Sequence, residues 1–83
     1  MDINTVTEKI ERFKFKAELF LRKNLKVFLK DIYDNYHFCE IISLDKDWVI
    51  IKHFKGKREG EKVRILWADI LIIDEYREAK KFR

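Results

Sequence analysis

Hydrophobic residues near the start of the chain recur at three- and four-residue steps. Ile10 and Phe13 begin a series that places apolar side chains on one face of a helix. Thr5 and Glu8 have the spacing of a capping box, in which the threonine side chain caps the helix and the glutamate bonds back. The pattern therefore predicts an amphipathic helix over about residues 6–23.

Two further apolar residues of this helix do not belong to that face. Phe15 and Leu19 lie roughly opposite Ile10 on a helical wheel. They are either an exposed apolar pair, which is common, or a second buried face against another subunit. The second interpretation makes Phe15 and Leu19 candidate residues of an oligomer interface.

The pattern of the chain changes to short strands after residue 24. Apolar runs separated by turn residues predict five strands at about 25–30, 36–44, 48–55, 62–66 and from 70 onward. The turns between them are rich in Asp and Asn, or are bounded by glycines, at 31–35, 45–47 and 56–60. A short break at 67–69 separates the last two strands.

Five short strands with tight connections favour a closed small barrel. We therefore expect a mainly β fold with an N-terminal α-helix, in which a strongly bent, five-stranded antiparallel barrel carries the helix over one open end. Residues 1–83 form one domain, with the barrel over about 25–76 and a charged C-terminal tail after it.

A chain of 83 residues builds a small core, so it gains more than a large domain from a partner. Cys39 is the single cysteine, which excludes an internal disulfide and fits a reducing, cytoplasmic location. We therefore expect a homo-oligomer. The absence of proline and glutamine, together with many Lys, Glu and Ile residues, is typical of thermophile proteins.

The charge balance permits a polyanionic partner. Nineteen basic and fifteen acidic residues give a net charge of +4. The apolar runs are too short to cross a bilayer, and the N-terminus does not resemble a signal peptide, so no membrane partner is expected. His37 and His53 lie on different predicted strands, and no glycine-rich phosphate loop is present. We accordingly expect no catalysis, no metal site and no cofactor.

Residues 41–52 contain an aspartate-bearing turn followed by aliphatic residues, and residues 63–73 contain two strands split by a short turn. These two stretches resemble the Sm-like family of RNA-binding proteins, including its bacterial Hfq branch. The resemblance implies a bent barrel and rings built by pairing the fourth strand of one subunit with the fifth of the next. Cys39, Asp47 and the pair Trp67-Ala68 replace the family's usual glycine, aromatic and basic residues, so its uridine-binding residues do not carry over.

The hairpin around residues 56–60 concentrates positive charge and is the first candidate for binding RNA or single-stranded nucleic acid. Its candidate residues are Lys52, Lys55, Lys57, Arg58 and Lys62. Such side chains neutralise phosphates. The alternative is a solvated hairpin tip whose charges prevent edge pairing.

Trp48 and Trp67 flank turns that line the central pore in the family, so they are candidates for stacking on bases. The alternative is that both tryptophans are core or subunit-contact residues. Ile65 and Ile72 lie on the strands that join subunits in the family, and complete the candidate interface. The expected function is binding of RNA or single-stranded nucleic acid by an Sm-like oligomer. The alternative is a protein-interaction or assembly scaffold without nucleic acid.

Overall fold

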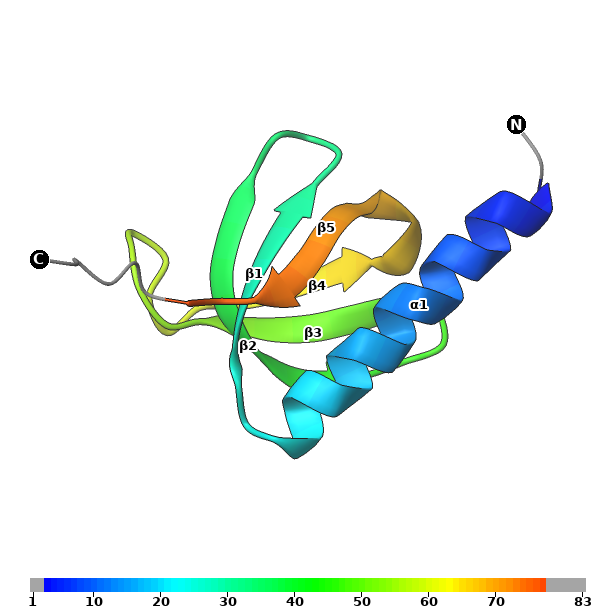
Figure 1. The fold of residues 1–83 in the computed structure, drawn as a ribbon. Coiled ribbons are helices and arrows are strands. Elements are labelled where there is room, and N and C mark those ends of the chain that lie inside the picture. The colour runs from blue at the N-terminus through cyan, green and yellow to red at the C-terminus, as the bar shows by residue number, and fades with distance from the viewer. Residues whose placement is uncertain (1–2, 78–83) are drawn as a thin grey trace, which may run out of the picture.

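The computed structural model describes residues 3–77 and has one helix followed by a five-stranded antiparallel sheet (Figure 1). The elements in chain order are α1 (Ile3–Arg22), β1 (Lys26–Asp31), β2 (Tyr36–Leu44), β3 (Trp48–His53), β4 (Lys62–Leu66), the 3₁₀ helix η1 (Trp67–Asp69) and β5 (Ile70–Glu75). The chain is thus mainly β, as the sequence predicts. Residues 78–83 of the predicted charged tail lie outside the described residues.

The strands follow the order β4-β3-β2-β1-β5. The sheet curls round on itself, and α1 lies across one side of it, in contact with β2, β5 and η1 (Figure 1). β4 and β5 are the two edges, and within residues 3–77 they are not hydrogen-bonded to each other. The predicted closure of the barrel is therefore not made by hydrogen bonds in this chain.

Alternation along each strand places the core inside the curl. In β1, Val27 and Leu29 are fully buried, whereas Phe28 between them faces outward and is only half-buried. The core combines residues from the helix, all five strands and η1: Ala17, Phe20, Val27, Leu29, Cys39, Ile41, Val49, Ile51, Ile65, Trp67, Ile70 and Ile73. The sheet bends where the register shifts in β2 between Ile41 and Ser43.

The start of α1 lies three residues before the predicted one, whereas its end lies within one residue of the prediction. The helix begins at Ile3, so Thr5 lies inside it and the predicted capping box does not mark its start. At the other end, the Leu25 N–H donates to the Phe20 carbonyl over 3.0 Å and Asn24 has a φ of 54°. This is a Schellman motif with asparagine in the left-handed position, and it turns the chain directly into β1.

Candidate functional site

Five aromatic side chains form a continuous outer surface over β1, β2 and the ends of β3 and β5. They are Phe28, Tyr36, Phe38, Phe54 and Tyr76. Each ring centroid lies 5.2–5.8 Å from that of a neighbouring ring, which is the spacing of stacked and edge-to-face pairs. The arrangement follows from alternation, because these strand residues occupy the positions between the inward-facing ones.

Three lysine ammonium groups lie over these rings. Lys55 Nζ is 4.6 Å from the Phe38 centroid and 4.5 Å from that of Tyr76, whose hydroxyl accepts a 2.6 Å hydrogen bond from it. Lys26 and Lys30 cover the remaining side of the surface, at 4.9 Å from Phe54 and 5.2 Å from Tyr36 respectively. We call the five aromatic residues and three lysines the lysine–aromatic face.

The lysine–aromatic face offers both chemical groups that a single nucleic-acid strand needs. A nucleobase stacked on an aromatic ring contributes about 1–3 kcal/mol, whereas an exposed cation–π contact contributes about 0.5–1 kcal/mol. Stacking of a base on such a ring would therefore outweigh the lysine contact, and would leave the flexible lysine free to contact a phosphate. Tyr36 is 52% exposed, so it is the ring most open to an incoming base.

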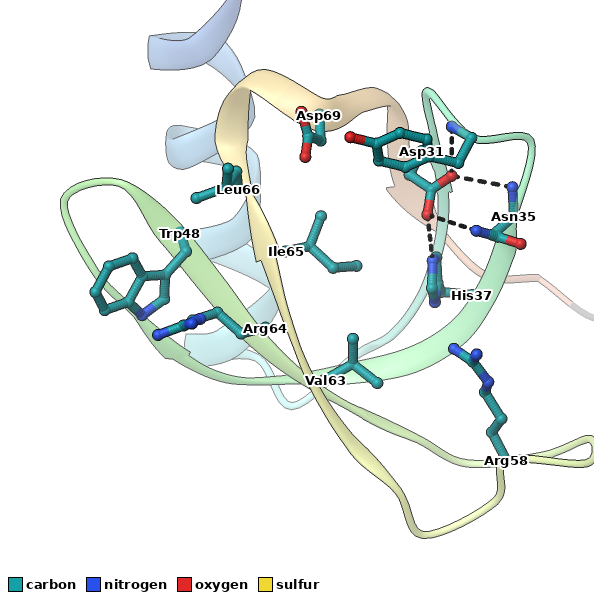
Figure 2. A pocket seen from close by; sticks show the side chains of 11 residues that line it. Asp31, Asn35, His37, Trp48, Arg58, Val63, Arg64, Ile65, Leu66 and Asp69 are labelled. Carbon is teal, nitrogen blue, oxygen red and sulfur yellow. Dashed lines mark hydrogen bonds and ion pairs between the residues drawn. The ribbon is translucent and has the colours of Figure 1, made fainter.

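A second feature is a groove of about 490 Å³ beside β4, at the seam where the sheet is open (Figure 2). We call it the seam groove. Val63 and Ile65 point into it from β4, and Arg58 reaches into it from the loop between β3 and β4. Asp31 and Asp69 also line it. Its acidic and basic side chains together give no preference for an anion, so it is a weaker candidate for phosphate than the lysine–aromatic face.

Asp31, His37 and His53 form a buried hydrogen-bonded chain behind the seam groove. His37 Nε2 lies 3.0 Å from Asp31 Oδ2, and His37 Nδ1 lies 3.1 Å from His53 Nε2. All three residues are at most 5% exposed. If Asp31 is ionised, His37 donates from Nε2 and accepts at Nδ1, so His53 donates from Nε2. Both His37 nitrogens are therefore hydrogen-bonded within this cluster.

The Asp31 carboxylate is fixed by several donors. The backbone N–H groups of Tyr33 and Asn35 donate to Oδ1 over 2.9 and 3.0 Å, and the Asn35 side chain donates to Oδ2 over 3.3 Å (Figure 2). Burial alone raises the pKa of Asp31, but these bonds and the one from His37 outweigh it and hold the pKa below its ordinary value. Burial, followed by the charge of His37, lowers the pKa of His53.

The basic residues of the predicted hairpin do not gather on one surface. Lys52 and Lys62 are cross-strand partners of β3 and β4, Arg58 lines the seam groove, and Lys57 is exposed in the loop. Lys55 alone joins the lysine–aromatic face. The hairpin charges are therefore divided among separate surfaces.

The two tryptophans lie on opposite faces of the sheet. Trp67 is 2% exposed, and its indole N–H donates to the Asp45 carbonyl over 2.8 Å. Trp67 is thus a core residue, which was the alternative that the sequence left open. Its buried ring has no exposed face on which a base could stack. Trp48 is half-buried on the outer face, where the Arg64 guanidinium lies 4.8 Å from its ring. The structure thus separates the two residues that were predicted to share a stacking platform.

The candidate interface residues also lie in different parts of the molecule. Phe15 is 67% exposed and Leu19 is half-buried, both on the side of α1 away from the sheet. Ile72 is 45% exposed and lines a hollow with Phe28 and Tyr76, at the margin of the lysine–aromatic face. Ile65 is 6% exposed in the core of the chain itself, where it has little surface left for a second subunit.

Sequence reasoning missed the buried chain and most of the lysine–aromatic face. The available signal was alternation, because Asp31 and His37 each fall at an inward position beside apolar neighbours. On the outer side, Phe28 and Phe38 fall between buried residues of the same strands. Strand pairing, which the sequence does not give, is what brings these residues together.

Comparison with known proteins adds no assignment, because no family model, curated protein or solved structure matches this chain. In the part of the chain that the structure describes, no group of three His, Cys, Asp or Glu side chains is placed to hold a metal ion. Over the same residues, no helix has the length and apolar character needed to cross a membrane. The functional argument therefore rests on the surfaces described above.

Proposed function

We propose that the chain is a divergent Sm-like protein that binds RNA or another single-stranded nucleic acid, as an oligomer in the cytoplasm and without catalysis. The observation that carries the proposal is the lysine–aromatic face. Five neighbouring rings provide stacking surfaces, and three lysines lie close enough to them to reach the phosphates of a stacked strand. Such a face reads bases by their flat surfaces and therefore tolerates many sequences.

The open edges of the sheet support the oligomeric part of the proposal. β4 pairs with β3 on one side only, and β5 pairs with β1 on one side only. Within residues 3–77, each edge therefore presents backbone N–H and C=O groups that have no strand partner, although the Ile73 carbonyl of β5 accepts a 3.4 Å hydrogen bond from Lys16 Nζ. A second copy would satisfy these groups by adding a strand. Pairing of β4 with β5 of the next copy, as in the Sm-like family, uses both edges and leaves the lysine–aromatic face on the outside.

The direct test is binding of fluorescently labelled RNA and DNA oligonucleotides, measured by anisotropy over a range of salt concentrations. Each phosphate neutralised on a single strand contributes about −0.7 to the slope of log K against log salt, so three lysines predict a slope of about −2. Lys55→Gln should make that slope shallower by about 0.7. Lys46→Gln, in the exposed turn between β2 and β3, is the matched control and should leave it unchanged. No binding of either oligonucleotide at low salt contradicts the proposal.

A second candidate function is an assembly scaffold that does not bind nucleic acid. Leu66 at the end of β4 and Leu71 in β5 are 46% and 42% exposed, so the open edges carry apolar side chains as well as free backbone groups. Exposed apolar residues beside unpaired strands favour protein contacts. An oligomer by sedimentation that fails to bind oligonucleotides at low salt supports this function over the first.

A further inference from the structure

The outward side of α1 carries a strip of charged and apolar residues that the fold of one chain does not use. Its members recur at three- and four-residue steps: Glu8, Glu11, Arg12, Phe15, Glu18, Leu19 and Arg22. We call them the Phe15 strip. The opposite side of α1 contributes Ala17 and Phe20 to the core, so the strip faces away from the sheet (Figure 1).

Within residues 7–77, the charged side chains of the Phe15 strip form no ion pair. The ion pairs recorded within residues 7–77 join Lys30 to Asp34, His37 to Asp31 and Arg77 to Glu75, and none of them involves the strip. All its charged side chains are exposed. Phe15, with 67% of its surface exposed, lies beside a shallow hollow of about 600 Å³ at the middle of the strip. The strip is thus apolar at its centre and has unpaired charges on both sides.

These charges have a twofold pattern centred on Phe15. If a second α1 runs antiparallel with Phe15 on the twofold axis, residues equally far from Phe15 in opposite directions face each other. Glu8 then lies opposite Arg22 of the partner subunit, because each is seven residues from Phe15. Arg12 lies opposite Glu18 of the partner subunit, because each is three residues away. Both contacts pair opposite charges, and symmetry makes each of them twice.

The apolar positions suit the same arrangement. Phe15 meets its own copy on the axis, and Leu19 lies against the methylene groups of Glu11 in the partner subunit. A parallel pair of helices instead places every residue opposite its own copy, so Glu8 meets Glu8 and Arg12 meets Arg12. Like charges at these facing positions repel, which favours the antiparallel arrangement over the parallel one.

We infer that α1 is a docking surface for a second copy of this chain, which binds as an antiparallel helix pair centred on Phe15. This contact is separate from strand addition at β4 and β5, so the two together join a pair of strand-linked assemblies. It is also separate from the lysine–aromatic face, which lies on the sheet.

Charge reversal with rescue tests the inference. Sedimentation of the parent protein without nucleic acid should show a self-association that weakens as salt rises. Arg12→Glu and Glu18→Arg should each weaken it about tenfold, because each turns two attractive contacts into repulsive ones. The double variant Arg12→Glu/Glu18→Arg restores both contacts in a symmetric pair and should recover the parent's association. Lys46→Glu makes the same change of net charge as Arg12→Glu, in the turn between β2 and β3 and outside the Phe15 strip, and should have no effect.

Cysteine cross-linking fixes the direction of the helices. Phe15→Cys should form a covalent dimer under mild oxidation, because the two sulfurs meet at the axis. Arg22→Cys should not, because each copy lies seven residues, or about 10.5 Å, from the axis in opposite directions, so the two copies are about 21 Å apart. Cys39 is buried and does not compete in this assay.

Several outcomes of these experiments would contradict the inference. Single charge variants that sediment like the parent, a double variant that associates no better than the single ones, or cross-linking of Arg22→Cys as readily as Phe15→Cys, contradict the antiparallel pair. None of these results bears on nucleic-acid binding, because no oligonucleotide is present and the lysine–aromatic face is unchanged. Conversely, sedimentation and cross-linking show whether the helix pair forms even if the protein binds no oligonucleotide.

Discussion

The two faces of the same strands differ in how their polar and aromatic groups are satisfied. On the inner face, Asp31, His37 and His53 saturate one another with hydrogen bonds in a buried chain. On the outer face of β1 and β2, exposed rings such as Tyr36 are covered only by flexible lysines. A saturated buried network stabilises the fold, whereas partly covered rings retain the capacity to bind. We therefore attribute the stability of the fold to the inner face and the proposed binding to the outer one.

The largest expected effect comes from breaking the buried hydrogen bonds that join Asp31, His37 and His53. Asp31→Ala leaves the His37 N–H buried without an acceptor and also removes the bonds that close the turn between β1 and β2. We expect the free energy of unfolding to fall by about 3 kcal/mol, measured by urea denaturation. Asp47→Ala is the matched control, because Asp47 is exposed in the turn between β2 and β3, and should change stability little. Equal effects of the two substitutions contradict the structural role of the chain.

Breaking the outer face should instead change binding and leave stability almost unaltered. Tyr36→Ala removes the most open ring of the lysine–aromatic face, and we expect oligonucleotide affinity to fall about fivefold to a hundredfold. Tyr33→Ala serves as the control, because Tyr33 is 67% exposed but lies in the turn, away from the stacked rings. Equal affinity of the parent and Tyr36→Ala would show that bases do not stack on this ring.

The sequence predicted the fold better than the site, for a physical reason. Alternating apolar residues predict strands such as β1, and the short break at η1 lies at 67–69 as expected. The helix start was predicted too late, because Thr5 and Glu8 also suit positions inside a helix. Local patterns of this kind do not specify which strands pair.

Only the pairing of strands brings the residues of each face together. Cys39 pairs with His53 across β2 and β3, and this register brings the His53 ring to His37. Lys55 was identified from charge alone, but its ring partner Tyr76 comes from the far end of the chain. Asp31 was assigned to a turn, and the structure places it at the end of β1, where it enters the core.

The inner chain also predicts how stability depends on pH. The pKa of His53 is lowered in the folded protein, so the unfolded chain binds the proton first as pH falls below the ordinary value of 6.5. Stability should therefore decrease from neutral pH toward lower pH. The lowered pKa of Asp31 predicts a second decrease below its ordinary value of 3.8. Urea titrations from pH 7.5 to 3 measure both. His53→Gln should abolish the first decrease, and a parent that gains stability between pH 7 and 5 contradicts this sign.

The smallest expected effect concerns Cys39, which faces inward beside this chain. Burial raises the pKa of its thiol to about 12, so at pH 8 only about one molecule in ten thousand carries the thiolate. A chromogenic disulfide reagent should leave the native thiol almost unmodified at pH 8 and react rapidly after unfolding in guanidinium chloride. Rapid reaction of the native protein contradicts the burial of this face.

The most direct test of the lysine–aromatic face compares both faces in one NMR titration with a single-stranded oligonucleotide. The account predicts that the ring signals of Tyr36, Phe38 and Tyr76 shift as oligonucleotide is added. The imidazole signals of His37 and His53, on the inner face, should stay in place. Shifts confined to Arg58, Arg64 and their neighbours in the seam groove, with the outer rings unaffected, would contradict the central claim.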